Sequence, residues 1–462
     1  MRLADAAQLL GAELIGPDGA IDGISTDSRD LSSGDLFVAI RGERFDGHDF
    51  VLMARDRDAC GVMVDHRLAV DLTQIVVPDT RVALGRFSAL WVEHVRSCRC
   101  APVRIAALTG SNGKTTVKEM LAAILRNCGE VLATRGNLNN EIGLPLTLLR
   151  LVEGHDYAVV EMGANHPGEI AYLAGLACPD VALVTNVGPA HLAGFGDLNG
   201  VARAKGEIYQ GLRPDGVAVI NRDEPYASYW KTLVGSRRIM EFGLDPNAEV
   251  SGRVLDPSRN RFRLRIDGRD IDIELSLPGL HNVRNALGAA AASFALGATP
   301  ETIRAGLERV SPVSGRMQQL SGRGGSTIVN DTYNANPASL QAAMNVVGAW
   351  QGARWLVLGD MGELGSDTAA LHAQAGIQAR QAGFERLFAL GEQSREAAAA
   401  FGANGLHFEG MDELLESVTG TLATARDAPI ILVKGSRSMR MERAVAALTI
   451  GPDRNSLSGG RS

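Results

Sequence analysis

The amino-acid sequence predicts an α/β protein with three domains. Its 462 residues are enough for about three domains of ordinary size. Apolar runs alternate with helical patterns over residues 103–296 and again from residue 313, which favours two doubly wound, mostly parallel sheets. We therefore expect a small mixed α/β domain at 1–82, a central doubly wound domain at 83–312 and a Rossmann-like domain at 313–450. The polar residues 451–462 are expected to form a flexible tail.

In the first domain, the patterns predict strands at 35–40, 61–64 and 73–77 among loops, followed by a linking helix over 82–95. In the second, they predict strands at 103–109, 157–161, 181–186 and 217–221, an antiparallel addition over 248–278, and helices from residue 114 and over 197–211 and 283–296. In the third, they predict strands at 327–330, 355–358, 387–390 and 430–433, and helices from Pro337 and over 368–382, 392–400 and 437–448. Asn336 is the expected cap of the helix that starts at Pro337.

Composition and charge argue against several classes of protein. The net charge of −7, without a basic block, argues against a dedicated nucleic-acid binder. The apolar runs are too short to span a bilayer, and the first residues do not read as a secretory signal. The 5 cysteines are scattered and lack the spacing of a zinc site. We therefore expect reduced thiols in a cytoplasmic protein without membrane insertion, acting as a monomer.

The strongest local signal is a glycine-rich turn between an apolar strand and an amphipathic helix. Backbone N–H groups of such a turn can surround phosphate oxygens. Lys114 would neutralise the β and γ phosphates of ATP, and the hydroxyl of Thr115 would bind Mg²⁺. The longer form of this pattern has glycine where this chain has Leu108, so a chance turn remains the alternative. The predicted ATP-binding residues of the turn are Gly110, Ser111, Asn112, Gly113, Lys114, Thr115 and Thr116.

Two residues near the ends of strands in the second domain are candidate metal ligands. Glu161 ends a buried strand, where a carboxylate is costly without a cation or another partner. His191 follows the next strand along the chain. Ligands of open α/β sheets bind at the carboxyl ends of the strands, so both residues point to one site. The alternatives are a capped or solvent-facing Glu161 and an ordinary surface histidine.

Lys205 falls in register with the apolar stripe of the predicted helix 197–211, which Leu198, Val201, Ile208 and Leu212 mark. One interpretation is a lysine whose charged end reaches water along the helix surface. The other is a partly desolvated amine with a lowered pKa. A neutral amine can add CO₂ to give a carbamate, which is a good Mg²⁺ ligand. The sequence leaves both interpretations open.

Further polar groups lie at strand ends or between the second and third domains. Asn282 opens the alanine-rich helix, where it could simply cap the helix. Such groups from two domains could face one cleft, and a cleft with a phosphate loop on one side suits ATP-driven joining of two substrates. Those of the third domain and its joint are Arg316, Asp331, Asn334, Asn336, Asp360 and Lys434.

These residues together resemble the ATP-dependent Mur ligases of peptidoglycan synthesis, over about residues 1–450. The segment Thr109–Thr115 matches the family's phosphate loop, which departs from the longer glycine-rich pattern in the same way. Three longer strings look like the members that add D-alanyl-D-alanine: STDSRD at 25–30, TRGNLNN at 134–140 and NDTYNANP at 330–337.

The resemblance implies an ATP-dependent carbon–nitrogen ligase. It would add D-alanyl-D-alanine to a UDP-N-acetylmuramoyl tripeptide through an acyl phosphate, giving the pentapeptide, ADP and phosphate. It implies catalytic roles for Lys114, His191 and Lys205, and two Mg²⁺ ions held by Thr115, Glu161, His191 and a CO₂-derived carbamate on Lys205. It further implies ATP contacts from Asn282, Arg316 and Asp331. Implied substrate contacts are Ser28 and Arg29 for the UDP end, with Asn137, Asn139, Asn140, Asn334, Asn336, Asp360 and Lys434 elsewhere.

Rival interpretations remain. A sibling ligase or a folylpolyglutamate-type ligase would keep the second domain but change the strings at 134–140 and 330–337. A phosphate-loop switch or ATPase would bind a partner and join nothing, but it would leave Lys205 and the third domain unexplained. A ligase releases ADP only with both co-substrates, whereas a switch needs neither.

Overall fold

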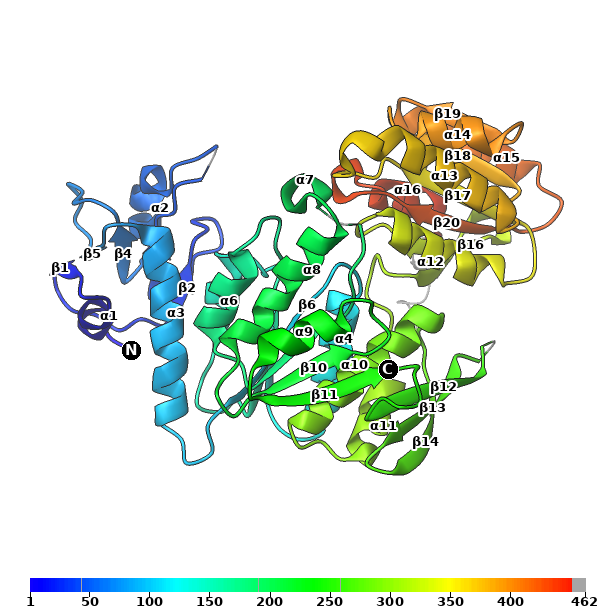
Figure 1. The fold of residues 1–462 in the computed structure, drawn as a ribbon. Coiled ribbons are helices and arrows are strands. Elements are labelled where there is room, and N and C mark those ends of the chain that lie inside the picture. The colour runs from blue at the N-terminus through cyan, green and yellow to red at the C-terminus, as the bar shows by residue number, and fades with distance from the viewer. Residues whose placement is uncertain (43, 190, 258, 451–462) are drawn as a thin grey trace, which may run out of the picture.

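The computed structural model describes residues 1–42, 44–189, 191–257 and 259–450, so the predicted tail lies outside the described residues. The predicted three-domain α/β architecture is confirmed. Figure 1 shows three bodies in a row, with the N-terminal part in blue, the central part in green and the C-terminal part in yellow to red. Each body contains one sheet, of 5, 9 and 6 strands in chain order. No helix among the described residues is long and apolar enough to cross a membrane.

The N-terminal sheet has the order β1-β5-β4-β3-β2, with β1 antiparallel to β5 and the other pairs parallel. Alternate residues of β3 and β4 point to opposite faces. Leu36 and Met63 pack under α1 and α3, whereas Phe37 and Val62 pack under α2. The elements are α1 Leu3–Leu10, β1 Glu13–Ile15, β2 Gly23–Ser25, β3 Asp35–Val38, α2 Val51–Asp56, β4 Gly61–Val64, β5 Gln74–Val76 and α3 Thr80–Ser97.

The central sheet has the order β14-β13-β12-β11-β10-β9-β6-β8-β7. The strands from β7 to β12 are parallel, and β13 and β14 add the predicted antiparallel extension. The strands are β6 Arg104–Thr109, β7 Val131–Ala133, β8 Tyr157–Glu161, β9 Val181–Val184, β10 Val217–Asn221, β11 Arg238–Gly243, β12 Val250–Asp256, β13 Arg261–Ile266 and β14 Arg269–Glu274. The helices are α4 Lys114–Leu125, α5 Gly143–Leu148, α6 Glu169–Ala177, α7 Leu192–Phe195, α8 Leu198–Gly206, α9 Ala227–Val234, α10 Leu280–Ala295 and α11 Pro300–Glu308.

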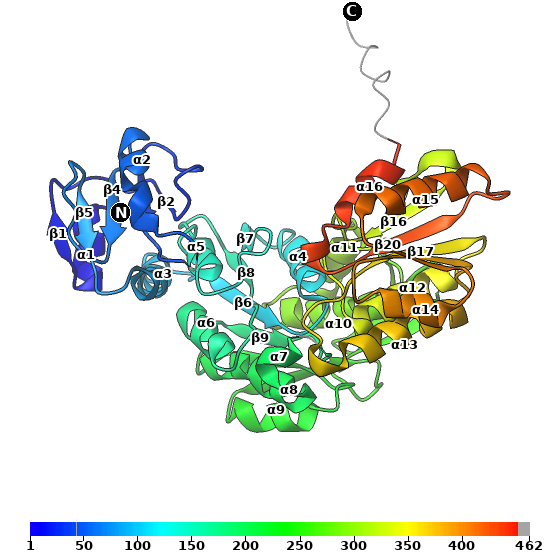
Figure 2. The ribbon, with the colours of Figure 1, turned by 90° about the horizontal axis from the view of Figure 1, so that it is seen from above.

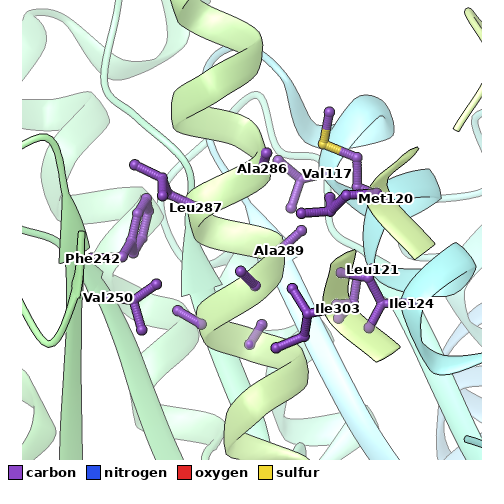
Figure 3. Close-up of a cluster of buried hydrophobic side chains, with 14 of the residues drawn as sticks. Val117, Met120, Leu121, Ile124, Phe242, Val250, Ala286, Leu287, Ala289 and Ile303 are labelled. Carbon is purple, nitrogen blue, oxygen red and sulfur yellow. The ribbon is translucent and has the colours of Figure 1, made fainter. Parts of the chain in front are cut away.

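The alanine-rich helix α10 explains how the phosphate-loop helix is held. Figure 3 shows α10 between the side chains of α4, such as Met120, and those of Phe242 and Val250 from the sheet. Its small residues, Ala286 and Ala289 among them, are fully buried and allow close helix packing. Because α4 packs against α10 along its length, the N-terminal end of α4 is held in a fixed position beside the site.

The predicted helix over 197–211 is divided in the structure. Helix α8 ends at Gly206, and a 3-10 turn follows over Glu207–Gly211. A side chain at Gly206 would come within 2.9 Å of the ring of Trp230, so the chain passes too close there for a larger residue. Leu198 is 43% exposed, which corrects its expected place on the apolar stripe. The other members of that stripe are buried.

The C-terminal sheet has the order β15-β16-β20-β17-β18-β19, parallel except for β15. The predicted helix over 437–448 is broken, because Arg440 has a left-handed backbone between a 3-10 turn and α16. The strands are β15 Gln318–Ser321, β16 Thr327–Asp331, β17 Arg354–Gly359, β18 Arg386–Leu390, β19 Gly405–Phe408 and β20 Ile430–Lys434. The helices are α12 Pro337–Gly348, α13 Thr368–Gln381, α14 Arg395–Phe401, α15 Met411–Ala423 and α16 Glu442–Leu448.

Candidate active site

The glycine-rich turn joins β6 to α4 and lies against the loop that follows β9. Gly110 and Gly113 have φ angles of 149° and 79°, a conformation that larger residues rarely adopt. A Cβ on Gly113 would lie 2.5 Å from the amide oxygen of Asn285, so that position also lacks room for a side chain. The backbone N–H of Asn112 donates to the side chain of Asn186 at 2.9 Å. The turn is therefore preformed, with its backbone fixed by its neighbours.

Lys114 is the first residue of α4, and its ammonium donates to the backbone carbonyl of Gly110 at 2.7 Å. Burial lowers the pKa of Lys114, while the nearby Glu161 carboxylate raises it and Arg316 lowers it. The three charged groups are thus close enough to influence one another. A polyphosphate in the turn would add the negative charge that this cluster lacks.

Glu161 ends β8 and is buried, which argues against the alternative of a solvent-facing carboxylate. The hydroxyl of Thr115 donates to one of its carboxylate oxygens at 2.9 Å, and the amide of Asn139 donates to the other at 2.8 Å. The guanidinium of Arg316, from the joint to the third domain, donates to the same hydroxyl at 2.8 Å. A buried carboxylate beside a hydroxyl is a donor set that suits a hard cation such as Mg²⁺.

His191 and Lys205 both lie beside the ring of Phe195. The His191 ring meets the Phe195 ring edge to face at 6.4 Å, and the Lys205 amine lies 5.3 Å from the centre of the same ring. Lys205 is 2% exposed, which excludes the interpretation of a charge that reaches water. Burial, aided by the charge of Lys114, lowers the pKa of Lys205 to about 7. Burial also lowers the pKa of His191, which the nearby Glu363 carboxylate raises.

On the third-domain side, Lys434 is buried and ion-paired with Asp331 at 2.5 Å. It also donates to the backbone carbonyl of Asn334 at 2.9 Å. Asn336 caps α12 as predicted, because its side chain accepts from the N–H of Ser339. The amide nitrogen of the same side chain donates across the cleft to Asn112 of the phosphate loop at 2.8 Å.

A cavity of about 980 Å³ lies between the second and third domains, and most of the predicted residues line it. Arg316 stacks on Tyr333 at its edge, with 4.2 Å between the guanidinium carbon and the ring centre. The residues brought together there are Ser111, Asn112, Gly113, Lys114, Thr115, Thr116, Asn137, Asn139, Asn140, Glu161, His191, Asn282, Arg316, Asp331, Asn334, Asn336 and Lys434.

Some predicted residues do not line this cavity. Asp360 turns away from it, because its carboxylate accepts from the backbone N–H of Ser394 at 2.7 Å and from the same residue's hydroxyl. Its contact with substrate stays a prediction. Asn282 does line the cavity but is no helix cap, since Gly279 occupies the cap position and the Asn282 amide donates to the backbone carbonyl of Pro278. Gly110 and Lys205 lie behind the cavity wall.

Ser28 and Arg29 lie in the N-terminal domain, outside the cavity. Arg29 is ion-paired with Asp27 through two side-chain hydrogen bonds of 2.9 and 2.7 Å. The Arg29 guanidinium lowers the pKa of Asp27 to about 2. Ser28 is buried and Arg29 is exposed, and neither residue lines the cavity that holds the phosphate loop.

Another cluster of histidines and carboxylates lies in the N-terminal domain. His48, Asp65 and His66 offer ligand atoms within 4.8 Å of one another. The two ring nitrogens of His48 already face protein partners, since Nδ1 lies 2.6 Å from Asp46 and Nε2 accepts from the N–H of Asp65 at 3.2 Å. These contacts hold two loops of that domain together.

Many residues that line the cavity were not predicted, among them Asn186, Asn285 and Tyr333, and neither was Glu363 beside it. Tyr333 lies inside the string at 330–337, and Asn285 follows Asn282 by three positions, so their neighbours were a usable signal. Glu363 contacts His191 from the third domain. Glu363 is an exposed glutamate, and no local sequence pattern marks it.

Comparison with protein-family models matches three segments of the chain. The Mur ligase family catalytic domain matches residues 20–92, the Mur ligase middle domain matches 108–293, and the Mur ligase glutamate ligase domain matches 315–437. These segments together cover most of the described chain.

Among characterised proteins, the chain is similar to the UDP-N-acetylmuramoyl-tripeptide–D-alanyl-D-alanine ligase of Escherichia coli. The two are 44% identical over 451 residues, which cover 96% of this chain and 98% of the relative. The Bacillus subtilis protein of the same name is 34% identical over 452 residues, covering 94% of each chain.

The fold is similar to solved structures along almost its whole length. MurF from Acinetobacter baumannii superposes with a TM-score of 0.89 at 35% identity, covering 96% of this chain and 97% of that one. MurF ligase from Thermotoga maritima in complex with ADP superposes with a TM-score of 0.80 at 26% identity, covering 92% and 96%.

Proposed function

The chain belongs to the Mur ligase family, and on this premise we propose that it is the ATP-dependent ligase that adds D-alanyl-D-alanine to a UDP-N-acetylmuramoyl tripeptide in peptidoglycan synthesis. The observation that carries the proposal is one cavity lined by the phosphate loop of the second domain and by polar groups of the third. The E. coli and B. subtilis relatives carry this activity in their names and match nearly the full chain.

The reaction has two steps. An oxygen of the tripeptide carboxylate attacks the γ-phosphorus of ATP, the bond to ADP breaks, and an acyl phosphate forms. The neutral amine of D-alanyl-D-alanine then attacks the acyl carbon. The carbon–oxygen bond to phosphate breaks, the amine loses a proton to solvent, and phosphate leaves with the carboxylate's former oxygen. The products are the UDP-muramoyl pentapeptide, ADP and phosphate.

Phosphoryl transfer depends mainly on position and on neutralising charge. Lys114 and Arg316 lie close enough to the phosphate loop to stabilise the γ-phosphate as its charge shifts. Thr115 and Glu161 are the proposed holders of Mg²⁺, with His191 across the cavity. Bound there, Mg²⁺ would supply further charge neutralisation at the transferring phosphoryl group. We propose Asn282 and Asp331 as nucleotide contacts.

We further propose that Lys205 carries a carbamate that completes a second Mg²⁺ site. Its buried position and its lowered pKa support a neutral amine near pH 7. Such an amine forms a nitrogen–carbon bond with CO₂ and releases one proton. The resulting carboxylate would lie near Phe195, whose ring His191 also contacts.

The remaining roles are proposed by position. Ser28 and Arg29 would hold the UDP end in a domain at 1–82. Residues 83–312 would hold ATP, and residues 313–450 would hold the dipeptide near Asn334, Asn336 and Lys434. Asn137, Asn139 and Asn140 would contact the peptide end of the sugar nucleotide. We place the reaction in the cytoplasm, where ATP is available and where free cysteines, as all five are here, stay reduced.

An ADP-release assay tests the function. Purified protein is given ATP and Mg²⁺ with a panel of UDP-muramoyl peptides and amino-acid or dipeptide acceptors, including tripeptides that end in meso-diaminopimelate and in L-lysine. We expect ADP only with a tripeptide and D-alanyl-D-alanine together. Release with a single amino acid as acceptor would identify a sibling ligase. Release without either co-substrate would identify an ATPase or switch.

A further inference from the structure

One ion pair joins the second and third domains beside the candidate metal site. The Nδ1 atom of His191 contacts the carboxylate of Glu363. His191 follows β9 and lines the cavity, whereas Glu363 follows β17 and its side chain is 61% exposed. Helix α7, which begins directly after His191, lies beside the third domain in both Figure 1 and Figure 2. The contact therefore depends on the third domain's position.

Both members of the pair have unusual backbones. His191 and Glu363 are non-glycine residues with φ angles of 53° and 62°. The left-handed conformation is costly for a non-glycine residue. Strain of this kind persists only where the surroundings impose it, and it is found most often at functional sites. Two such residues face each other here across a domain boundary.

The loop that carries Glu363 is anchored on both sides. The N–H of Met361 donates to the ring of His372 at 3.0 Å, and the N–H of Ser436 donates to the carbonyl of Asp360 at 2.9 Å. Met361 and Leu364 are buried on either side of the exposed glutamate. The loop therefore holds Glu363 out toward the second domain from a fixed base.

A carboxylate on one ring nitrogen of a histidine has a known physical effect. It keeps the proton on Nδ1, which leaves the lone pair of Nε2 available to a metal ion and sets the ring's orientation. Here that carboxylate comes from a different domain than the histidine. We propose that Glu363 is a positioning residue for His191, so that the metal site gains its full affinity only when the third domain is closed.

The inference rests on the proposed function for the metal site, and a binding measurement that needs no turnover separates the two. Mn²⁺ affinity is measured by electron paramagnetic resonance with a non-hydrolysable ATP analogue and the UDP-muramoyl tripeptide bound. The variants are Glu363→Ala, Glu363→Gln, His191→Ala and the double variant. Glu416→Ala is the matched control, since this exposed glutamate of α15 forms no ion pair with any described residue.

We expect Glu363→Ala to weaken Mn²⁺ binding by about 10–100-fold, the usual effect of losing such a partner. The Mn²⁺ affinity of Glu363→Gln should fall between those of the wild type and Glu363→Ala, because the glutamine amide oxygen accepts from Nδ1–H but carries no charge. In the His191→Ala background, Glu363→Ala should cause no further loss. Wild-type Mn²⁺ affinity in a folded Glu363→Ala protein overturns the proposal. An undiminished effect of Glu363→Ala on Mn²⁺ affinity in the His191→Ala background also overturns it. An effect confined to the KM for the dipeptide overturns it too, because it would make Glu363 a substrate contact.

Discussion

Lys114 is the residue whose single charge should matter most to turnover. Its ammonium lies in the mouth of the phosphate loop, beside Glu161 and Arg316. Removing one preorganised charge of this kind costs about 10²–10³-fold in kcat. We expect at least that loss for Lys114→Ala, with an unchanged circular dichroism spectrum. Lys231→Ala, a surface lysine paired with Glu241, is the control and should keep its activity. Near wild-type ligation by folded Lys114→Ala would contradict the phosphate-loop assignment.

Substitutions of Lys205 show whether this buried residue acts as a carbamate or as an unmodified lysine. Lys205→Arg should be inactive, because a guanidinium stays protonated and cannot take up CO₂. Lys205→Ala should also lose activity and regain part of it with a short-chain carboxylic acid, whose carboxylate can fill the vacated space. Steady-state rates with and without the acid check both expectations. An active, well-folded Lys205→Arg protein would exclude the carbamate.

The same residue predicts a pH dependence. Burial lowers the pKa of Lys205 to about 7 from its ordinary value of 10.5, so the protonated amine dominates only below about pH 7. Because only the neutral form adds CO₂, carbamate and activity should fall as the pH drops below 7. Added bicarbonate should raise the rate above that pH and have little effect well below it. A rate that is insensitive to CO₂ across pH 6–8 would argue against this role.

At the scale of elements, Asn336 joins a helix cap to the phosphate loop. Its side chain caps α12 and also donates to Asn112 across the cleft. Losing a cap costs about 1 kcal/mol of stability. We expect Asn336→Ala to lose that stability in denaturant unfolding and also to raise the KM for ATP.

The matched control is Asp79→Ala, which removes the cap of α3, and Asp79 does not line the cavity. It should lose similar stability and keep the KM for ATP. Equal KM values for the two variants would mean that the Asn112 contact does not support nucleotide binding.

Elements with clear patterns could be predicted from the sequence, whereas several others were missed, including the 13-residue helix α15. The strand and helix around the phosphate loop were predicted because β6 and α4 are long and their patterns clear. Helices α1 and α2 were missed, since they have only 8 and 6 residues. Strands β15 and β19 lie at sheet edges, where half-exposed residues blur the alternation.

For the site, position in the sheets decided which residues could be predicted. Residues on the phosphate loop or at strand ends of the parallel sheets were predictable, because sheet topology gathers strand ends at one edge. Asp360 also follows a strand end, but its carboxylate accepts from the N–H of Ser394 and does not line the cavity, so its substrate contact stays a prediction. Glu363 could not be predicted, since its partner is fixed only by how two domains meet.

At the scale of the whole molecule, polar side-chain contacts between described residues join the third domain to the second: Arg316 to Thr115, Asn336 to Asn112, and Glu363 to His191. Because these polar contacts are few, we expect them to break and re-form as substrates enter and leave. We expect ATP plus the sugar nucleotide to reduce the radius of gyration in solution scattering. An identical profile with both bound at saturation would contradict a closing third domain.

The account's central claim is that the substrate carboxylate is activated as an acyl phosphate in the cavity between these two domains. Isotope transfer tests this most directly. The terminal carboxylate of the UDP-muramoyl tripeptide is labelled with ¹⁸O on both oxygens, the ligation is run with ATP and D-alanyl-D-alanine, and the released phosphate is analysed by mass spectrometry. We predict one ¹⁸O atom in each phosphate released, because the bridging oxygen leaves with phosphorus. Unlabelled phosphate formed together with the pentapeptide would contradict the claim.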